Sequence, residues 1–319
     1  MRRRSAIHLI RIAGVVSSLS ALLFLSPLLP GAAPASDDFT IRNDVRLVLL
    51  DVSVQNHGAF VPGLTRADFS VSEEGKPQVI SVFDNQDAPV TMGILVDESA
   101  SMTPRRTQVL TAAGSLIGES NRADELFVLN FNDSVKRGLP AGVQFSDSIP
   151  DLEAALYRGR PMGKTALYDA MIDGLKNLDA GRRGRKTLVL ITDGGDTTSR
   201  HTRAEAIAML ELSNATVFTV GLIDEGDSSD QEIDPGLLKH LAHISGGEAF
   251  FPKTGAEVQD ACHRIAQEIR SRYTIGYVPR DDAGLPALRH IRVRVNAPGR
   301  SGLAVLTRTS YRYDRQTNK

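Results

Sequence analysis

Residues 90–102 read VTMGILVDESASM, an almost unbroken apolar run that ends in alternating oxygen-bearing side chains. An apolar run without polar alternation indicates a strand buried on both faces, as in a parallel sheet covered by helices. Similar runs follow at 126–131, 187–192 and 215–222, with helical stretches between them. This order predicts an α/β fold with a mostly parallel sheet and crossover helices over residues 90–272.

Oxygen-bearing side chains follow the ends of two of these runs. Asp97, Ser99 and Ser101 come after the first strand, Thr165 lies at the expected start of a helix, and Asp193 follows the strand at 187–192. Ligands of open parallel sheets bind beyond the carboxyl ends of the strands. Two carboxylates and three hydroxyls suit Mg²⁺, with Mn²⁺ or Ca²⁺ as alternatives. Each segment alone also has a simpler explanation, because Ser, Thr and Asp are common helix N-caps.

The pattern Asp97-x-Ser99-x-Ser101, followed by Thr165 and Asp193, resembles the metal-ion-dependent adhesion site of the von Willebrand factor type A domain. The resemblance covers about residues 90–272, and further phrases that carry it are GKTALYDA at 163–170, ITDGGD at 191–196, GLTRADF at 63–69 and YTIGYVP at 273–279. The family resemblance implies a doubly wound sheet with a metal site on its upper face. Together with the flanking phrases, the sequence resembles a secreted bacterial subfamily of such proteins. The three hydroxyls would ligate the metal directly, and the two carboxylates would act largely through waters.

Such a site implies binding without catalysis. A cation held by neutral hydroxyls keeps most of its charge and attracts a carboxylate from a partner protein. We therefore expect a secreted adhesion or scaffold module that captures Asp or Glu of a partner, and not an enzyme. A structural subunit of an envelope complex, with a purely structural metal, is one alternative.

A metal-dependent hydrolase is a second alternative to a binding module. The residue two positions after Asp97 is Ser99, where a phosphotransferase of the haloacid dehalogenase type has a second Asp. Neither Ser99 nor Ser101 lies in a Gly-x-Ser-x-Gly motif.

Glu98 adds a carboxylate beside the site. We expect it to be a solvated bystander, and an influence on cation preference is the alternative.

Residues 1–35 have the pattern of a secretory signal peptide. Three arginines at positions 2–4 precede an apolar stretch at 12–29, and Ala33-Pro34-Ala35 offers small residues before a cut at Ser36. An uncleaved anchor is the alternative. No later stretch approaches the roughly 20 apolar residues of a membrane span. The mature protein is therefore expected in the periplasm or outside the cell, without a membrane span.

The regions on either side, residues 36–89 and 273–319, read as strands. Apolar residues alternate with polar ones at 48–54 and again at 291–295, the period of half-buried strands. About three strands in each region are too few for an independent core. We therefore expect both regions to form one small β-sandwich with the α/β domain inserted between them. Separate packing of each region on the α/β domain is the alternative.

Composition narrows the functional classes further. The 319 residues contain no Trp and carry a formal net charge of −1, which argues against nucleic-acid binding.

Charge is divided unevenly along the chain. Residues 36–263 carry 21 basic and 34 acidic side chains (net −13), whereas residues 264–319 carry 12 basic and 4 acidic side chains (net +8). We expect these regions to attract each other, and an Arg-rich tail that meets an anionic envelope partner is the alternative. The single Cys, Cys262, lies on the apolar face of a predicted helix and is expected to be a buried, inert thiol.

Overall fold

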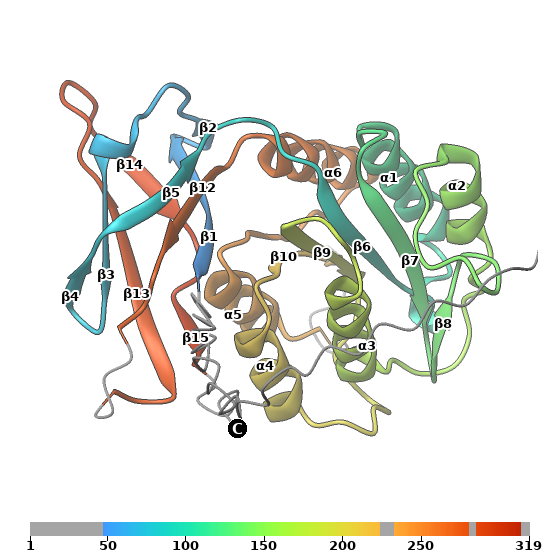
Figure 1. Ribbon diagram of the computed structural model, residues 1–319. Coiled ribbons are helices and arrows are strands. Elements are labelled where there is room, and N and C mark those ends of the chain that lie inside the picture. Colours follow the sequence, from blue (N-terminus) through green and yellow to red (C-terminus); the bar gives the residue numbers. More distant parts are fainter. Residues whose placement is uncertain (1–46, 224–232, 281–284, 314–319) are drawn as a thin grey trace, which may run out of the picture. The chain divides into compact units, whose positions relative to one another are not determined.

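The computed structural model of the chain describes residues 47–223, 233–280 and 285–313 (Figure 1). The predicted signal peptide, residues 1–35, lies outside these ranges. The described residues belong to one compact unit, residues 45–319. None of their helices is long and apolar enough to cross a membrane.

A six-stranded sheet forms the centre of the α/β part, in the order β11-β10-β9-β6-β7-β8. All neighbouring strands are parallel except β8, which runs antiparallel to β7. The predicted mostly parallel sheet is confirmed, and the four apolar runs are β6, β7, β9 and β10. The bounds are β6 Val90–Asp97, β7 Glu125–Phe131, β8 Val135–Arg137, β9 Arg185–Thr192, β10 Thr216–Gly221 and β11 Ala249–Phe250.

Helices cover both faces of this sheet, which is therefore doubly wound (Figure 1). On one side α1 (Arg106–Gly118) contacts α2 (Ile149–Tyr157) and α6 (Gly255–Arg270). On the other side α4 (Arg203–Leu212) contacts α3 (Leu167–Asp179) and α5 (Pro235–Ser245). Helix α6 shows the expected apolar stripe, and Cys262 on that stripe is fully buried.

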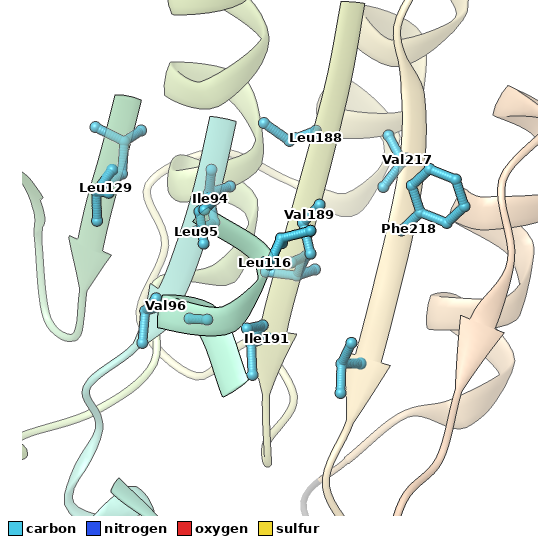
Figure 2. Close-up of a cluster of buried hydrophobic side chains, with 14 of the residues drawn as sticks. Ile94, Leu95, Val96, Leu116, Leu129, Leu188, Val189, Ile191, Val217 and Phe218 are labelled. Atoms are coloured by element: carbon cyan, nitrogen blue, oxygen red, sulfur yellow. The ribbon is translucent and has the colours of Figure 1, made fainter. Parts of the chain in front are cut away.

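The core of this domain explains why β6 has no polar alternation. All eight residues of β6 are buried, because β7 and β9 flank it within the sheet and helices cover both of its faces. Figure 2 shows Ile94, Leu95 and Val96 of β6 beside Val189 of β9. Burying each such side chain contributes about 1.5–3 kcal/mol. The apolar run that identifies the strand is therefore also what fixes it at the centre.

The two flanking regions pair with each other, as expected. One sheet has the order β14-β1-β12-β5 with β2 on β1, and the other has the order β15-β13-β3-β4. Both sheets thus combine strands from the two ends of the chain. The N-terminal strands are β1 Val48–Asn56, β2 Ala59–Phe60, β3 Phe69–Glu73, β4 Lys76–Gln78 and β5 Ile80–Asp84, and the C-terminal ones are β12 Tyr273–Tyr277, β13 Leu288–Val295, β14 Leu303–Leu306 and β15 Ser310–Arg312.

The described flanks contain five and four strands, more than the three expected in each, because short strands such as β2 and β4 carry no readable alternation. Leu50 and Val52 of β1, Val71 of β3 and Val293 of β13 bury their side chains in one shared core. The expected β-sandwich is therefore present. The domain boundaries at 35/36, 89/90 and 272/273 stay predictions.

The inserted domain enters and leaves the sandwich from neighbouring strands. β5 precedes β6 along the chain, and α6 precedes β12. β5 and β12 pair antiparallel, with Asp84 opposite Thr274. The two connections therefore begin at the same end of one strand pair.

Ion pairs join the basic C-terminal region to acidic residues earlier in the chain, as the charge division suggests. Arg270 contacts Asp124 at 2.5 Å, and Arg312 contacts Glu211 at 2.9 Å. Part of the opposite charge of the two regions is thereby neutralised within the fold.

Candidate metal centre

Asp97 ends β6 and is almost completely buried, with 1% of its surface exposed. The Ser99 N–H donates to its Oδ1 at 2.8 Å, and the Thr192 hydroxyl donates to its Oδ2 at 2.6 Å. Thr192 is the last residue of β9, the neighbouring strand. Burial raises the pKa of Asp97 to about 6, against the opposing effect of these two donors. Among the described residues no cationic side chain forms an ion pair with it.

The next three predicted residues form a continuous row of oxygen atoms. Ser99 Oγ lies 3.0 Å from Ser101 Oγ, and the Ser101 hydroxyl donates to Asp193 Oδ1 at 2.9 Å. Asp193 directly follows β9. Ser99 is buried, whereas Ser101 is exposed, so the row runs from the interior to the surface. Four of the five predicted residues are thus linked by direct contacts.

Thr165, the fifth predicted residue, lies against the same loop. A Cβ added at Gly194, the residue after Asp193, would lie 3.6 Å from the Thr165 hydroxyl oxygen. The Thr197 N–H donates to the Thr165 carbonyl at 2.9 Å, which holds this segment to the loop after β9. All five residues therefore gather at the carboxyl edge of the sheet.

These side chains are not helix caps, which was the simpler explanation for them. Ala166, and not Thr165, is the N-cap of α3. Thr165 lies one residue before the N-cap, so its predicted position at the helix start is wrong by one residue. Ser99 precedes the short 3₁₀ helix η2 (Ala100–Met102) without a capping bond from its side chain. The hydroxyls therefore remain available to a ligand.

The donor set fits a hard divalent cation. Adjacent oxygen ligands of octahedral Mg²⁺ lie about 3 Å apart, because the metal–oxygen distance is about 2.1 Å. The Ser99–Ser101 and Ser101–Asp193 oxygen pairs already have this separation. Within the described ranges no group of three or more His, Cys, Asp and Glu side chains is placed to hold a metal, and the candidate site combines two carboxylates with three hydroxyls.

Glu98 is not the solvated bystander that the sequence predicts. It is buried, and its Oε2 accepts from Arg106 Nε at 3.1 Å. Burial raises the pKa of Glu98, and the Arg106 guanidinium opposes that shift. The reason is local: α1 begins at Arg106 and brings the guanidinium back over the loop after β6.

Two contributors were not predicted as parts of the site, namely Thr192 and Arg106. Thr192 is visible as the hydroxyl at the carboxyl end of a buried strand, immediately before Asp193. Arg106 carries no comparable signal, because its role depends on the path of the chain after η2.

The fold and the site together define a doubly wound α/β domain with an oxygen-ligand site at the carboxyl ends of its central strands. The von Willebrand factor type A domain matches residues 92–283, and the chain belongs to this family. Domains of the family are generally protein-interaction modules that bind a divalent metal. Among curated proteins no match was found.

Solved structures share the fold at low sequence identity. A von Willebrand factor type A protein from Catenulispora acidiphila is 14% identical and covers 86% of this chain and 76% of its own, with a TM-score of 0.50. Proximal thread matrix protein 1 from the mussel byssus is 15% identical over 62% of this chain and 51% of its own, also at 0.50. Another structure of that mussel protein, with a zinc-occupied MIDAS motif, is 16% identical over 58% and 48%, at 0.47. This chain spans about half the length of the mussel protein.

Proposed function

We propose that this chain is an exported protein-binding module that captures a carboxylate of a partner protein through a bound divalent cation. The proposed ligands are Asp97, Ser99, Ser101, Thr165 and Asp193, and the proposed cation is Mg²⁺, with Mn²⁺ or Ca²⁺ as substitutes. Export rests on the signal-peptide pattern of residues 1–35.

One observation carries the proposal: the buried carboxylate of Asp97, which has no cationic side chain as partner in the described residues, lies beside the uncharged hydroxyls of Ser99 and Ser101. A buried charge is costly unless it is paired. Asp97 has only neutral donors, the Ser99 N–H and the Thr192 hydroxyl. A divalent ion beside it would supply the missing positive charge.

The residues of the chain have distinct tasks in this proposal. Asp97 supplies negative charge from the buried side of the site, and the hydrogen bond from the Thr192 hydroxyl fixes the orientation of its carboxylate. Ser99 and Ser101 supply neutral oxygens, so they do not consume the charge of the cation. When bound, the cation would offer a partner carboxylate an attraction of about 4 kcal/mol for each unit of its net positive charge, at 4 Å and an effective dielectric constant of about 20. The exposed position of Ser101 leaves room for such a ligand from outside.

We also propose that the site binds without catalysing a reaction. Nucleophilic catalysis needs a hydroxyl within hydrogen-bonding reach of a general base that is itself oriented. In the described parts of the chain the side-chain hydroxyls of Ser99 and Ser101 form hydrogen bonds with each other and with Asp193, and no histidine is among these partners. This arrangement supports a ligand site rather than a nucleophile.

Calorimetry with Mg²⁺, Mn²⁺, Ca²⁺ and Zn²⁺ tests the metal site. We expect one divalent ion per chain, and at least about tenfold weaker affinity in Asp97→Ala and Thr165→Ala, since each removes an oxygen donor. Asp179→Ala, at the other end of α3, is the matched control and should bind like the wild type. Equal affinity in all four proteins would contradict the proposed ligands.

Capture from envelope extract, with and without a chelator, separates binding from a purely structural metal. If the chain is a binding module, removal of the metal should release the partner, and the Asp97→Ala variant should not capture it. If chelation lowers the melting temperature but leaves a specific partner bound, the metal is structural and the proposed function is wrong.

A further inference from the structure

The last residue of α2 and the segment that connects it to Thr165, together residues 157–164 (the rim segment), expose an unusual set of side chains. Its sequence is YRGRPMGK, with three cations and no acid. Tyr157 is 61% exposed and Met162 is 57% exposed, among the most exposed large apolar residues described. Arg158, Arg160 and Lys164 are exposed too. Tyr, Met and Arg are enriched in protein interfaces.

Backbone hydrogen bonds hold the rim segment directly against the loop that carries the proposed ligands. The Met162 N–H donates to the Glu98 carbonyl at 2.9 Å, and the Ala100 N–H donates to the Gly163 carbonyl at 3.1 Å. Glu98 lies between Asp97 and Ser99, and Ala100 lies between Ser99 and Ser101. The backbone of Met162 is therefore adjacent to the loop that carries the proposed ligands Asp97, Ser99 and Ser101.

A buried side-chain contact fixes the other half of the rim segment. Arg106, paired with Glu98, donates from Nη2 to the Gly159 carbonyl at 2.6 Å. A Cβ at Gly159 would lie 2.1 Å from Glu98 Oε1, so only glycine fits there without displacement. A segment held in this way loses little conformational entropy when a partner binds. This gives buried Glu98 a role in positioning the rim segment.

The cationic side chains of the rim segment have no ion-pair partner among the described residues. This holds for Arg158, Arg160 and Lys164. The nearby acid, Asp133, accepts from the Lys164 backbone N–H at 2.9 Å. A cationic surface with one exposed methionine beside a proposed carboxylate site fits an acidic partner segment with an apolar residue.

We propose that the rim segment selects the residues that flank the captured carboxylate. The partner would present one acid to the cation, a large apolar side chain within two residues of it to contact Met162, and further acids to contact Lys164 and Arg160. This inference rests on the proposed function, because it concerns the surroundings of the same site.

A displayed library of short random peptides, selected on the full chain in Mg²⁺, tests this. We expect enriched peptides to combine an acid with a neighbouring large apolar residue and additional acids, and to be released by chelator. Met162→Ala should weaken the selected peptides about tenfold, as truncation of a central contact does. Leu212→Ala, an equally exposed apolar residue on α4, should leave affinity unchanged.

The charge contribution is tested with a matched lysine pair. Lys164→Gln should reduce affinity about threefold, more at low salt than at high salt, because contacts at an interface edge act mainly through long-range attraction. Lys176→Gln, exposed on α3, should have no effect.

The possible failures are distinguishable. Selected peptides that stay bound in chelator would overturn the proposed function itself. Metal-dependent peptides that show no apolar preference, and whose affinity is unchanged in both Met162→Ala and Lys164→Gln, would overturn the inference about the rim segment alone.

Discussion

Two carboxylates are equally hidden in this molecule but differ in what surrounds them. Glu73, in the β-sandwich, is 2% exposed, and Asp97, in the α/β domain, is 1% exposed. Arg289 Nη1 lies 3.0 Å from Glu73 Oε1, and the hydroxyls of Tyr277 and Tyr311 donate to Oε2 at 2.7 and 2.8 Å. Asp97 accepts only from neutral groups and has no such cation in the described structure.

The difference separates a carboxylate that stabilises the fold from one suited to an external ion. Arg289 is fully buried, lies 3.6 Å from the centre of the Tyr313 ring and compensates Glu73 internally. Burial raises the pKa values of Tyr277 and Tyr311, so both remain protonated donors. The sandwich thus contains its own counter-charge. In the α/β domain no described side chain supplies a positive counter-charge to Asp97, and burial, together with the nearby charge of Asp193, raises the pKa of Asp97 to about 6.

The largest expected effect follows from removing the internal cation. Arg289→Met should destabilise the protein by about 3–5 kcal/mol, because it leaves Glu73 charged and unpaired in the core. Denaturant unfolding measures this, with Arg292→Met, an exposed arginine on the same strand, as control. Mg²⁺ affinity of the folded variant should be unchanged. Equal stability of the two variants would remove the basis of the comparison.

Removing the uncompensated charge should have a smaller effect of opposite sign. Without metal, Asp97→Asn should be as stable as the wild type or more so, because a costly buried charge is lost. In Mg²⁺ at about 100 times the dissociation constant of the wild type, the wild type should gain about 2.7 kcal/mol, and a variant whose affinity is at least about tenfold weaker should gain about 1.4 kcal/mol or less. Thermal melts with and without Mg²⁺ measure both effects, with Asp179→Asn as control. A marked loss of stability without metal would assign Asp97 the same structural role as Glu73.

The smallest expected effect concerns a buried group that stays neutral. Burial raises the pKa of the Cys262 thiol to about 12. A raised pKa leaves less thiolate, and at pH 8 only about one thiol in ten thousand is ionised. The native protein should therefore not react with a thiol reagent over minutes, whereas the unfolded protein should react at once. Rapid labelling under native conditions would show that α6 opens locally.

Much of the fold could be predicted from short stretches of sequence. The strand at 90–97 is visible because burial on both faces removes polar residues from it. The gathering of Asp97, Ser99 and Asp193 is also predictable, since β6 and β9 are parallel neighbours and the three residues follow their carboxyl ends. Position along a parallel strand thus fixes the place of these side chains.

The parts that could not be predicted depend on contacts between distant residues. Glu98 reads as a variable, solvated position, yet Arg106 and Gly159 enclose it in the fold. Glu73 and Arg289 are separated by 216 positions in the chain. Each alone looks like an ordinary surface charge on a strand, and only the pairing of β3 with β13 brings them together.

The opposition of Asp84 and Thr274 at the edge of the sandwich has a consequence for modularity. The sheet loses no strand pairing where the α/β domain is inserted, because a tight turn at this point would simply convert β5 and β12 into a hairpin. The strand pairing of the sandwich is therefore complete without the α/β domain, which is an insertion between two paired strands. The two covalent joints of this domain lie on adjacent strands, so another domain with closely spaced ends could be grafted in its place.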